Sequence, residues 1–103
     1  MALQKLNITL DRLKEGMVTG EEVNGKMLVV LMLQGRVYAL DAVCTHEGGP
    51  LNEGSIDGNE IICPWHSGAY NIATGKANEN TPWVSDINSY RVEVNGNELS
   101  VEI

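Results

Sequence analysis

The sequence of 103 residues contains no phenylalanine, and it has only two cysteines, two histidines and three prolines. Without phenylalanine, the core has to be built mainly from leucine, valine, isoleucine and methionine. Two cysteines are too few for the disulfide framework of a small secreted domain. The placement of the four cysteine and histidine side chains is therefore the first feature to examine for chemistry.

Positive charge is also scarce, because 7 lysines and arginines stand against 14 aspartates and glutamates, for a net charge of −7. Phosphate binding needs a basic patch, so we expect no nucleic-acid partner and no attachment to an anionic membrane surface. No lysine or arginine lies between Arg36 and Lys76. The acidic residues in this interval are Asp41, Glu47, Glu53, Asp57 and Glu60. We expect this acidic region to dock on a basic protein surface.

Long apolar stretches are lacking as well. The longest covers residues 27–33, whereas a membrane-spanning helix needs about 20 residues. The N-terminal region carries Lys5, Asp11 and Arg12 and has no apolar core of a secretory signal. We therefore expect a cytoplasmic protein, in which cysteines more often bind metal or do chemistry than form disulfides.

The sequence does contain short alternating segments separated by glycine. Residues 90–94 and 99–103 alternate apolar and polar side chains on either side of Asn95-Gly96-Asn97, which predicts a β-hairpin. The pair Asn24-Gly25 and the glycine Gly35 predict two further hairpins. The apolar run between them predicts a strand buried on both faces. Helical periodicity is limited to one possible turn, so we expect a single all-β domain over residues 1–103.

All four scarce side chains fall in two short motifs, Cys44-x-His46 and Cys63-x-x-His66, with sixteen residues between His46 and Cys63. Unrelated buried residues, a Cys44–Cys63 disulfide and a structural zinc site are three interpretations. Zinc sites usually pair cysteine with cysteine and histidine with histidine, and here each motif supplies one of each. In a 2Fe–2S cluster with two cysteines on one iron and two histidines on the other, each motif would reach both irons.

The segments CTHEGGPL and CPWHSGAYNIATGKA resemble the two cluster-binding loops of Rieske proteins, and the resemblance to soluble Rieske-type ferredoxins of ring-hydroxylating dioxygenase systems extends over most of the chain. It implies an antiparallel β-sandwich with a cluster-binding loop subdomain, about residues 42–70, at one tip. It also implies one Rieske 2Fe–2S cluster per chain. The implied ligands are Cys44, His46, Cys63 and His66, with the histidines nearer to solvent.

The same resemblance suggests roles for neighbouring residues. Tyr70 matches a tyrosine that donates to a cysteine sulfur, although an ordinary core aromatic fits its position equally well. High-potential Rieske proteins have a serine two residues after the second histidine, where this chain has Gly68, while Ser67 lies one residue earlier. Losing that donor predicts a potential toward the lower end of the Rieske range, around −150 mV.

Aromatic and proline residues near the motifs complete the expected site. Trp65 and Pro50 are expected to shield the cluster from water, with an exposed docking contact as the alternative for Trp65. Trp83 carries no motif and is expected to pack in the core or at its edge.

The function implied by the resemblance is one-electron carriage from a flavin-dependent reductase to a terminal oxygenase. We expect no independent catalysis, because an oxygenase needs a second, mononuclear iron and both histidines are already used. No dinucleotide fingerprint follows a strand, so reduction by a nicotinamide would need a partner. Two alternatives remain, the small subunit of an assimilatory nitrite reductase and a redox-silent zinc-binding interaction module.

Overall fold

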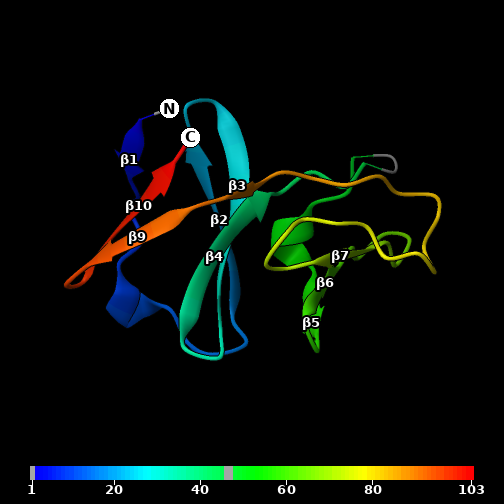
Figure 1. The fold of residues 1–103 in the computed structure, drawn as a ribbon, viewed down its shortest axis with the longest axis horizontal. Helices are drawn as coiled ribbons and strands as arrows, with labels where there is room; N and C mark the ends of the chain where they lie inside the picture. Colours follow the sequence, from blue (N-terminus) through cyan, green and yellow to red (C-terminus); the bar gives the residue numbers. More distant parts are fainter. Residues whose placement is uncertain (1, 46–47) are drawn as a thin grey trace.

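The computed structural model describes residues 2–45 and 48–103, and it consists almost entirely of short antiparallel strands (Figure 1). The elements are β1 (Leu3–Lys5), η1 (Leu10–Arg12), β2 (Val18–Val23), β3 (Lys26–Leu33), β4 (Arg36–Asp41), η2 (Leu51–Glu53), β5 (Ser55–Asp57), β6 (Glu60–Ile62), β7 (Ala69–Asn71), β8 (Ser89–Tyr90), β9 (Val92–Asn95) and β10 (Glu98–Glu102). None of the helical turns in the described ranges has the length and apolar character needed to cross a membrane.

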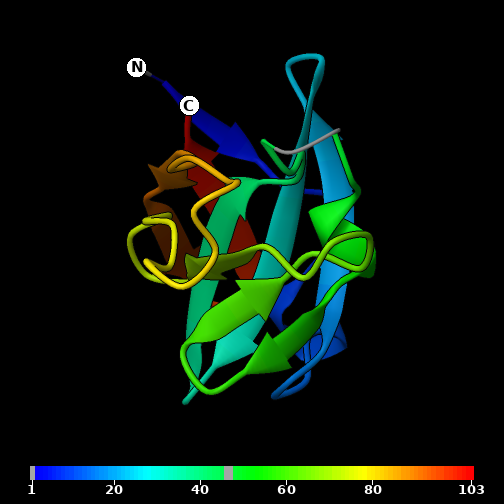
Figure 2. The same ribbon diagram turned by 90° about the vertical axis from the view of Figure 1, so that its right-hand side faces the viewer.

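The strands form three sheets with the orders β1-β10-β9, β2-β3-β4-β8 and β5-β6-β7. The central sheet, β2-β3-β4-β8, lies between the other two (Figure 1). Figure 2 shows the β5-β6-β7 sheet stacked in front of the long strands of the central sheet. This arrangement confirms the predicted all-β sandwich with a loop-rich subdomain at one end.

Glycine-containing turns set the register of the hairpins. Asn24-Gly25 between β2 and β3 and Gln34-Gly35 between β3 and β4 have positive φ at both residues, as a two-residue type I′ loop requires. In the closing hairpin, Asn95 pairs with Glu98, so the two-residue loop is Gly96-Asn97. The three predicted hairpins are confirmed, and Asn95 itself belongs to the strand.

Strand β3 is buried on both faces, as its apolar run predicted. Leu28 and Val30 pack in the core shared with the β1-β10-β9 sheet, whereas Val29 and Leu31 pack in a second core. All four side chains are fully buried. The second core includes the two cysteines together with residues of the third sheet. The central sheet therefore supports the cysteine-bearing subdomain through continuous apolar packing.

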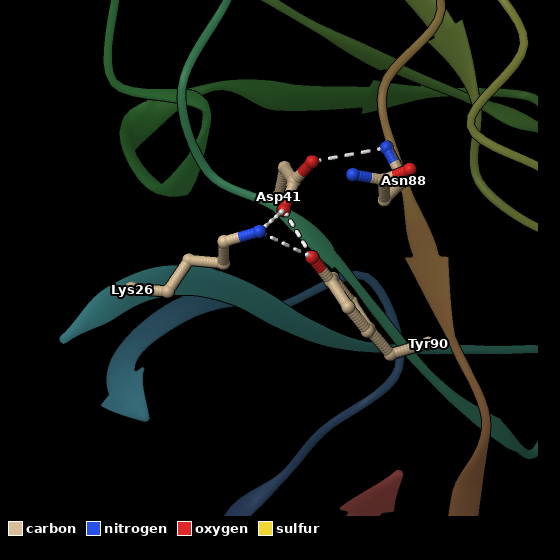
Figure 3. Close-up of polar contacts among 4 residues, drawn as sticks. All are labelled: Lys26, Asp41, Asn88 and Tyr90. Carbon is tan, nitrogen blue, oxygen red and sulfur yellow. Dashed lines mark hydrogen bonds and ion pairs between the residues drawn. The ribbon is translucent and has the colours of Figure 1, made fainter. Parts of the chain in front are cut away.

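Two chain segments connect the central sheet to the subdomain, and Asp41 joins them where the end of β4 runs beside the segment that leads into β8 (Figure 3). Its carboxylate accepts hydrogen bonds from the Tyr90 hydroxyl at 2.6 Å and the Asn88 N–H at 3.0 Å. Lys26 Nζ lies 3.8 Å from the same carboxylate and donates to the Tyr90 hydroxyl at 3.1 Å. Asp41 thus has partners inside this chain and helps to hold the fold together.

Candidate metal centre

The first cysteine motif is a tight loop closed by its own backbone. The Cys44 N–H donates to the Gly49 carbonyl at 2.8 Å, and the Gly48 N–H donates back to the Cys44 carbonyl at 3.1 Å. Gly48 has a φ of 71°, in the left-handed region that glycine adopts without steric cost. The loop therefore reverses direction within five residues and leaves the Cys44 side chain at its base.

The second motif is the same loop built from different residues. The Cys63 N–H donates to the Gly68 carbonyl at 2.8 Å, and the Ser67 N–H donates to the Cys63 carbonyl at 3.1 Å. Ser67 has a φ of 59° and occupies the position that Gly48 occupies in the first loop. The recurrence of glycine five residues after each cysteine was a signal of this equivalence in the sequence. The two loops thus present their cysteines in matching positions.

The two cysteine side chains lie side by side as free thiols, each only 1% exposed. This excludes the disulfide interpretation in the structure. Burial raises the pKa of the Cys63 thiol, because the thiolate loses its hydration. The backbone N–H groups of Trp65 and His66 hydrogen-bond to the Cys63 side chain and act in the opposite direction.

Tyr70 on β7 is fully buried, and its hydroxyl lies 3.2 Å from the Cys44 sulfur. Burial raises the pKa of Tyr70 to about 12, and the contact with Cys44 adds to this effect. The phenol therefore remains protonated at neutral pH and can donate to an acceptor sulfur. Tyr70 is therefore a core aromatic whose hydroxyl also contacts a cysteine sulfur.

The donors around the sulfurs fit a pair of metal-bound thiolates. A thiolate only accepts hydrogen bonds, and here two backbone N–H groups face Cys63 while the Tyr70 hydroxyl contacts Cys44. A Cβ atom on Gly49 would lie 2.7 Å from the Cys63 sulfur, so the loop leaves that sulfur unobstructed only because this residue is glycine. Over residues 2–45 and 48–103, no three Cys, His, Asp or Glu side chains lie close enough to share one metal ion. His66 is exposed, and His46 lies outside the described residues.

The expected shielding residues, Trp65 and Pro50, both lie near the first loop. Trp65 is 55% exposed, and its ring lies beside Gly49, where an added Cβ atom would be 3.3 Å from the ring. The exposed part of the ring fits the alternative of a docking contact. Pro50 is partly buried and forms a bridge with Val43 at the base of the first loop.

Trp83 is 45% exposed, so of the two expected positions the edge of the core fits and its interior does not. The neighbouring residue, Val84, is 7% exposed and packs against the second loop instead. A Cβ atom on Gly68 would lie 2.6 Å from Val84 Cγ1. The space that a serine would need at this position is therefore filled by Val84, and Ser67 itself is exposed in its left-handed conformation.

Sequence reasoning did not single out two residues that the structure brings to this site. Thr45 contacts the Tyr70 hydroxyl, and Ser85, forty residues further along, contacts Thr45. Thr45 lies next to a cysteine, but nothing in the sequence relates Ser85 to it, because the long segment after β7 returns to the first loop only in the tertiary fold (Figure 1).

A stack of antiparallel sheets that carries two matched cysteine loops at one end defines a β-sheet iron–sulfur protein. A family model described as the Rieske 2Fe–2S domain matches residues 6–91, and the chain belongs to this family. It accordingly carries one Rieske-type 2Fe–2S cluster.

Individual relatives agree with this assignment. The chain is 41% identical over 85 residues to the ferredoxin component of the naphthalene 1,2-dioxygenase/salicylate 5-hydroxylase systems from Ralstonia sp., covering 82% of this chain and 81% of that protein. The ferredoxin of carbazole 1,9a-dioxygenase from Nocardioides aromaticivorans IC177 is similar in structure, with a TM-score of 0.89 and 32% identity over 98% of this chain and 97% of that one.

Two further solved structures bear on the partner and on the alternatives. A chain in a complex of reduced oxygenase and oxidized ferredoxin in carbazole 1,9a-dioxygenase has a TM-score of 0.85 and 30% identity, over 96% of this chain and 91% of that one. A nitrite reductase small subunit from Mycobacterium tuberculosis also has a TM-score of 0.85, over 97% of this chain and 93% of that one. At 17% identity, the second likeness shows only a common fold.

Proposed function

We propose that this protein is a one-electron carrier that passes electrons from a flavin-dependent reductase to a terminal ring-hydroxylating oxygenase. The observation that carries the proposal is the pair of buried free thiols on two equivalent loops at one end of the molecule. A cluster held there would be anchored on the apolar core through the two cysteines, while His66 on the second loop is exposed. The likeness to ferredoxin components of dioxygenase systems supports the partners named here.

In the proposed ligand set, Cys44 and Cys63 bind one iron and His46 and His66 bind the other. The burial of both cysteines and the exposure of His66 support this division. Two neutral imidazoles in place of two thiolates make the site less negative, so an added electron is stabilised on the histidine-bound iron. The solvent-facing histidine would then be the point at which the electron leaves the protein.

The surface around this end supports docking through an apolar centre with an acidic rim. Val43, Trp65 and Trp83 are exposed apolar side chains close to the two loops. Asp86 is exposed and lines a groove of about 260 Å³ together with Val43. We propose that a terminal oxygenase presents a basic surface with an apolar centre to this region.

The carrier is proposed to act in the cytoplasm and to have no turnover of its own. The nitrite reductase alternative has only the common fold in its favour, and the match to the Rieske family stands against the zinc alternative.

The direct test of this function is the EPR spectrum of the dithionite-reduced protein, with iron, zinc and sulfide assayed on the same sample. We expect a rhombic signal with a lower average g value than an all-cysteine cluster gives, at two irons and two sulfides per chain. The asymmetric ligand set is the physical reason for both the rhombicity and the lower average. A colourless, EPR-silent protein holding one zinc per chain would refute electron carriage and leave a zinc module.

The docking proposal predicts a specific effect of one charge. Asp86→Asn removes the negative charge but keeps the oxygen that accepts a hydrogen bond from the Ala77 N–H at 2.8 Å. We expect the second-order rate of electron transfer to a cognate oxygenase to fall roughly two- to fivefold at low salt and the salt dependence to weaken. The matched control is Glu22→Gln, the same change of charge at an exposed position of β2. Equal effects of the two variants would indicate a general charge effect without a docking site at Asp86.

A further inference from the structure

The Thr45 hydroxyl connects two segments that are far apart in the sequence. On one side, the Ser85 N–H donates to Thr45 Oγ1 at 2.7 Å, and Oγ1 lies 3.2 Å from the Ser85 carbonyl oxygen. On the other side, Oγ1 lies 3.1 Å from the Tyr70 hydroxyl. The Thr45 N–H also donates to that hydroxyl, at 3.0 Å. Although Thr45 is an exposed residue, its polar groups are therefore directed inward.

The protons available in this network restrict how it can be arranged. Each hydroxyl has one proton, and each already accepts one backbone N–H. The two protons must therefore be shared among three contacts: Tyr70 to the Cys44 sulfur at 3.2 Å, Thr45 to Tyr70, and Thr45 to the Ser85 carbonyl. When Tyr70 donates to Thr45, the sulfur receives no hydrogen bond from the phenol.

The state of Cys44 selects between these arrangements. A metal-bound thiolate can only accept, so the phenol proton is then best placed on the sulfur, where the hydrogen bond is charge-assisted. Thr45 can in turn donate to Tyr70, and a hydroxyl that accepts a hydrogen bond donates a stronger one. A free Cys44 thiol can instead donate to the Tyr70 hydroxyl. Tyr70 then donates to Thr45 Oγ1, and Thr45 donates to the Ser85 carbonyl.

We infer that Thr45 is a positioning residue for the cluster, whose hydroxyl directs the Tyr70 proton onto the Cys44 sulfur and thereby raises the redox potential. The inference rests on the proposed ligand set, in which Cys44 binds the cluster. It assigns to Thr45 an effect that acts through Tyr70, in addition to the mechanical connection with Ser85. A purely mechanical role would not depend on the Tyr70 hydroxyl, and this difference can be measured.

The test is the midpoint potential of the cluster-loaded protein in five forms: unmodified, Thr45→Val, Thr45→Ser, Tyr70→Phe and the Thr45→Val/Tyr70→Phe double variant. Hydrogen bonds to a cluster sulfur stabilise the reduced state, so Tyr70→Phe should lower the potential and Thr45→Val should lower it by less. Thr45→Ser keeps the hydroxyl and should restore the unmodified value. In the Tyr70→Phe background, Thr45→Val should cause no further shift.

Hydrogen exchange supplies a second measurement that does not depend on the potential. The Ser85 amide should exchange faster in Thr45→Val, which removes its acceptor, and at the unmodified rate in Thr45→Ser. Unchanged exchange in Thr45→Val would contradict the connection between Thr45 and Ser85 that the inference uses.

Several results would overturn the inference. One is an equal shift from Thr45→Val with and without the Tyr70 hydroxyl, and another is a Thr45→Ser potential as low as that of Thr45→Val. If Thr45→Val does not load the cluster, Thr45→Ala replaces it. If neither Thr45→Val nor Thr45→Ala binds the cluster while Thr45→Ser binds it normally, Thr45 acts in cluster assembly alone and the inference is overturned. An unchanged potential in Tyr70→Phe, in which Thr45 is intact, would also overturn the inference, whereas loss of the rhombic, low-average-g EPR signal in the unmodified protein would count against the proposed ligand set.

Discussion

His66→Cys is expected to keep a coloured 2Fe–2S cluster but to lower its midpoint potential by about 100 mV or more. A thiolate in place of a neutral imidazole would add one negative charge to the surroundings of the cluster, so reduction would become less favourable. Plant-type clusters with four cysteines lie near −400 mV, compared with about −150 mV at the low end of the Rieske range. Replacing one of the two histidines should therefore account for a substantial part of this difference in midpoint potential.

The measurement is a spectroelectrochemical titration of the purified protein. The matched control is Ser67→Cys, which places a thiol on the adjacent exposed residue of the same loop. We expect that control to keep the unmodified potential. An unchanged potential in His66→Cys would show that His66 is not a ligand.

Gly49→Ala should cause the loss of most of the bound iron and sulfide. The added Cβ would lie 2.7 Å from the Cys63 sulfur and 3.3 Å from the Trp65 ring, so it would occupy space beside a proposed cluster ligand. Overpacking a filled site costs about 1–3 kcal/mol, and here the atom displaced is the sulfur itself. Because the φ of Gly49 is not in the left-handed region, this loss reflects space and not backbone conformation.

The adjacent residue provides the matched control for this prediction. Gly48→Ala would place its Cβ 3.9 Å from Val43, which is ordinary van der Waals contact, but at a φ of 71°. It should cost about 1–2 kcal/mol of stability through backbone strain and still load the cluster. The measurements are iron and sulfide per chain, together with thermal unfolding of both variants. Full loading of Gly49→Ala would show that the Cys63 sulfur can move without cost.

The sequence predicted the fold well because its signals are local. Glycine turns such as Asn24-Gly25 determine where strands reverse, and alternation of apolar residues determines which face is buried. The apolar run in β3 predicted burial on both faces, and each face packs in a separate core. The exposure of Trp83 could not be predicted in this way, because it depends on Val84 taking the space beside Gly68.

The candidate site, like the fold, was predictable from the sequence only in part. The motifs placed Cys44 and Cys63 in paired loops, and the resemblance identified Tyr70 as a partner of a cysteine sulfur. The roles of the acidic side chains were harder to predict. Asp41, for example, contacts both Lys26 and Tyr90, and no local sequence pattern indicates these contacts. Composition showed a surplus of acid in this region, but only the packing shows which carboxylates have internal partners.

The sequence by itself determined the class of this protein, because ligand types and their spacing are properties of short segments that any fold must accommodate. It also determined the hairpins, because turn conformation depends on a few adjacent residues. Only the tertiary structure decided that Ser85 contacts Thr45, that Val84 fills the space at Gly68 and that Trp65 is largely exposed. The first two features depend on the return of the segment before β8 to the cysteine loops, and contacts between residues so far apart leave no pattern in a single sequence.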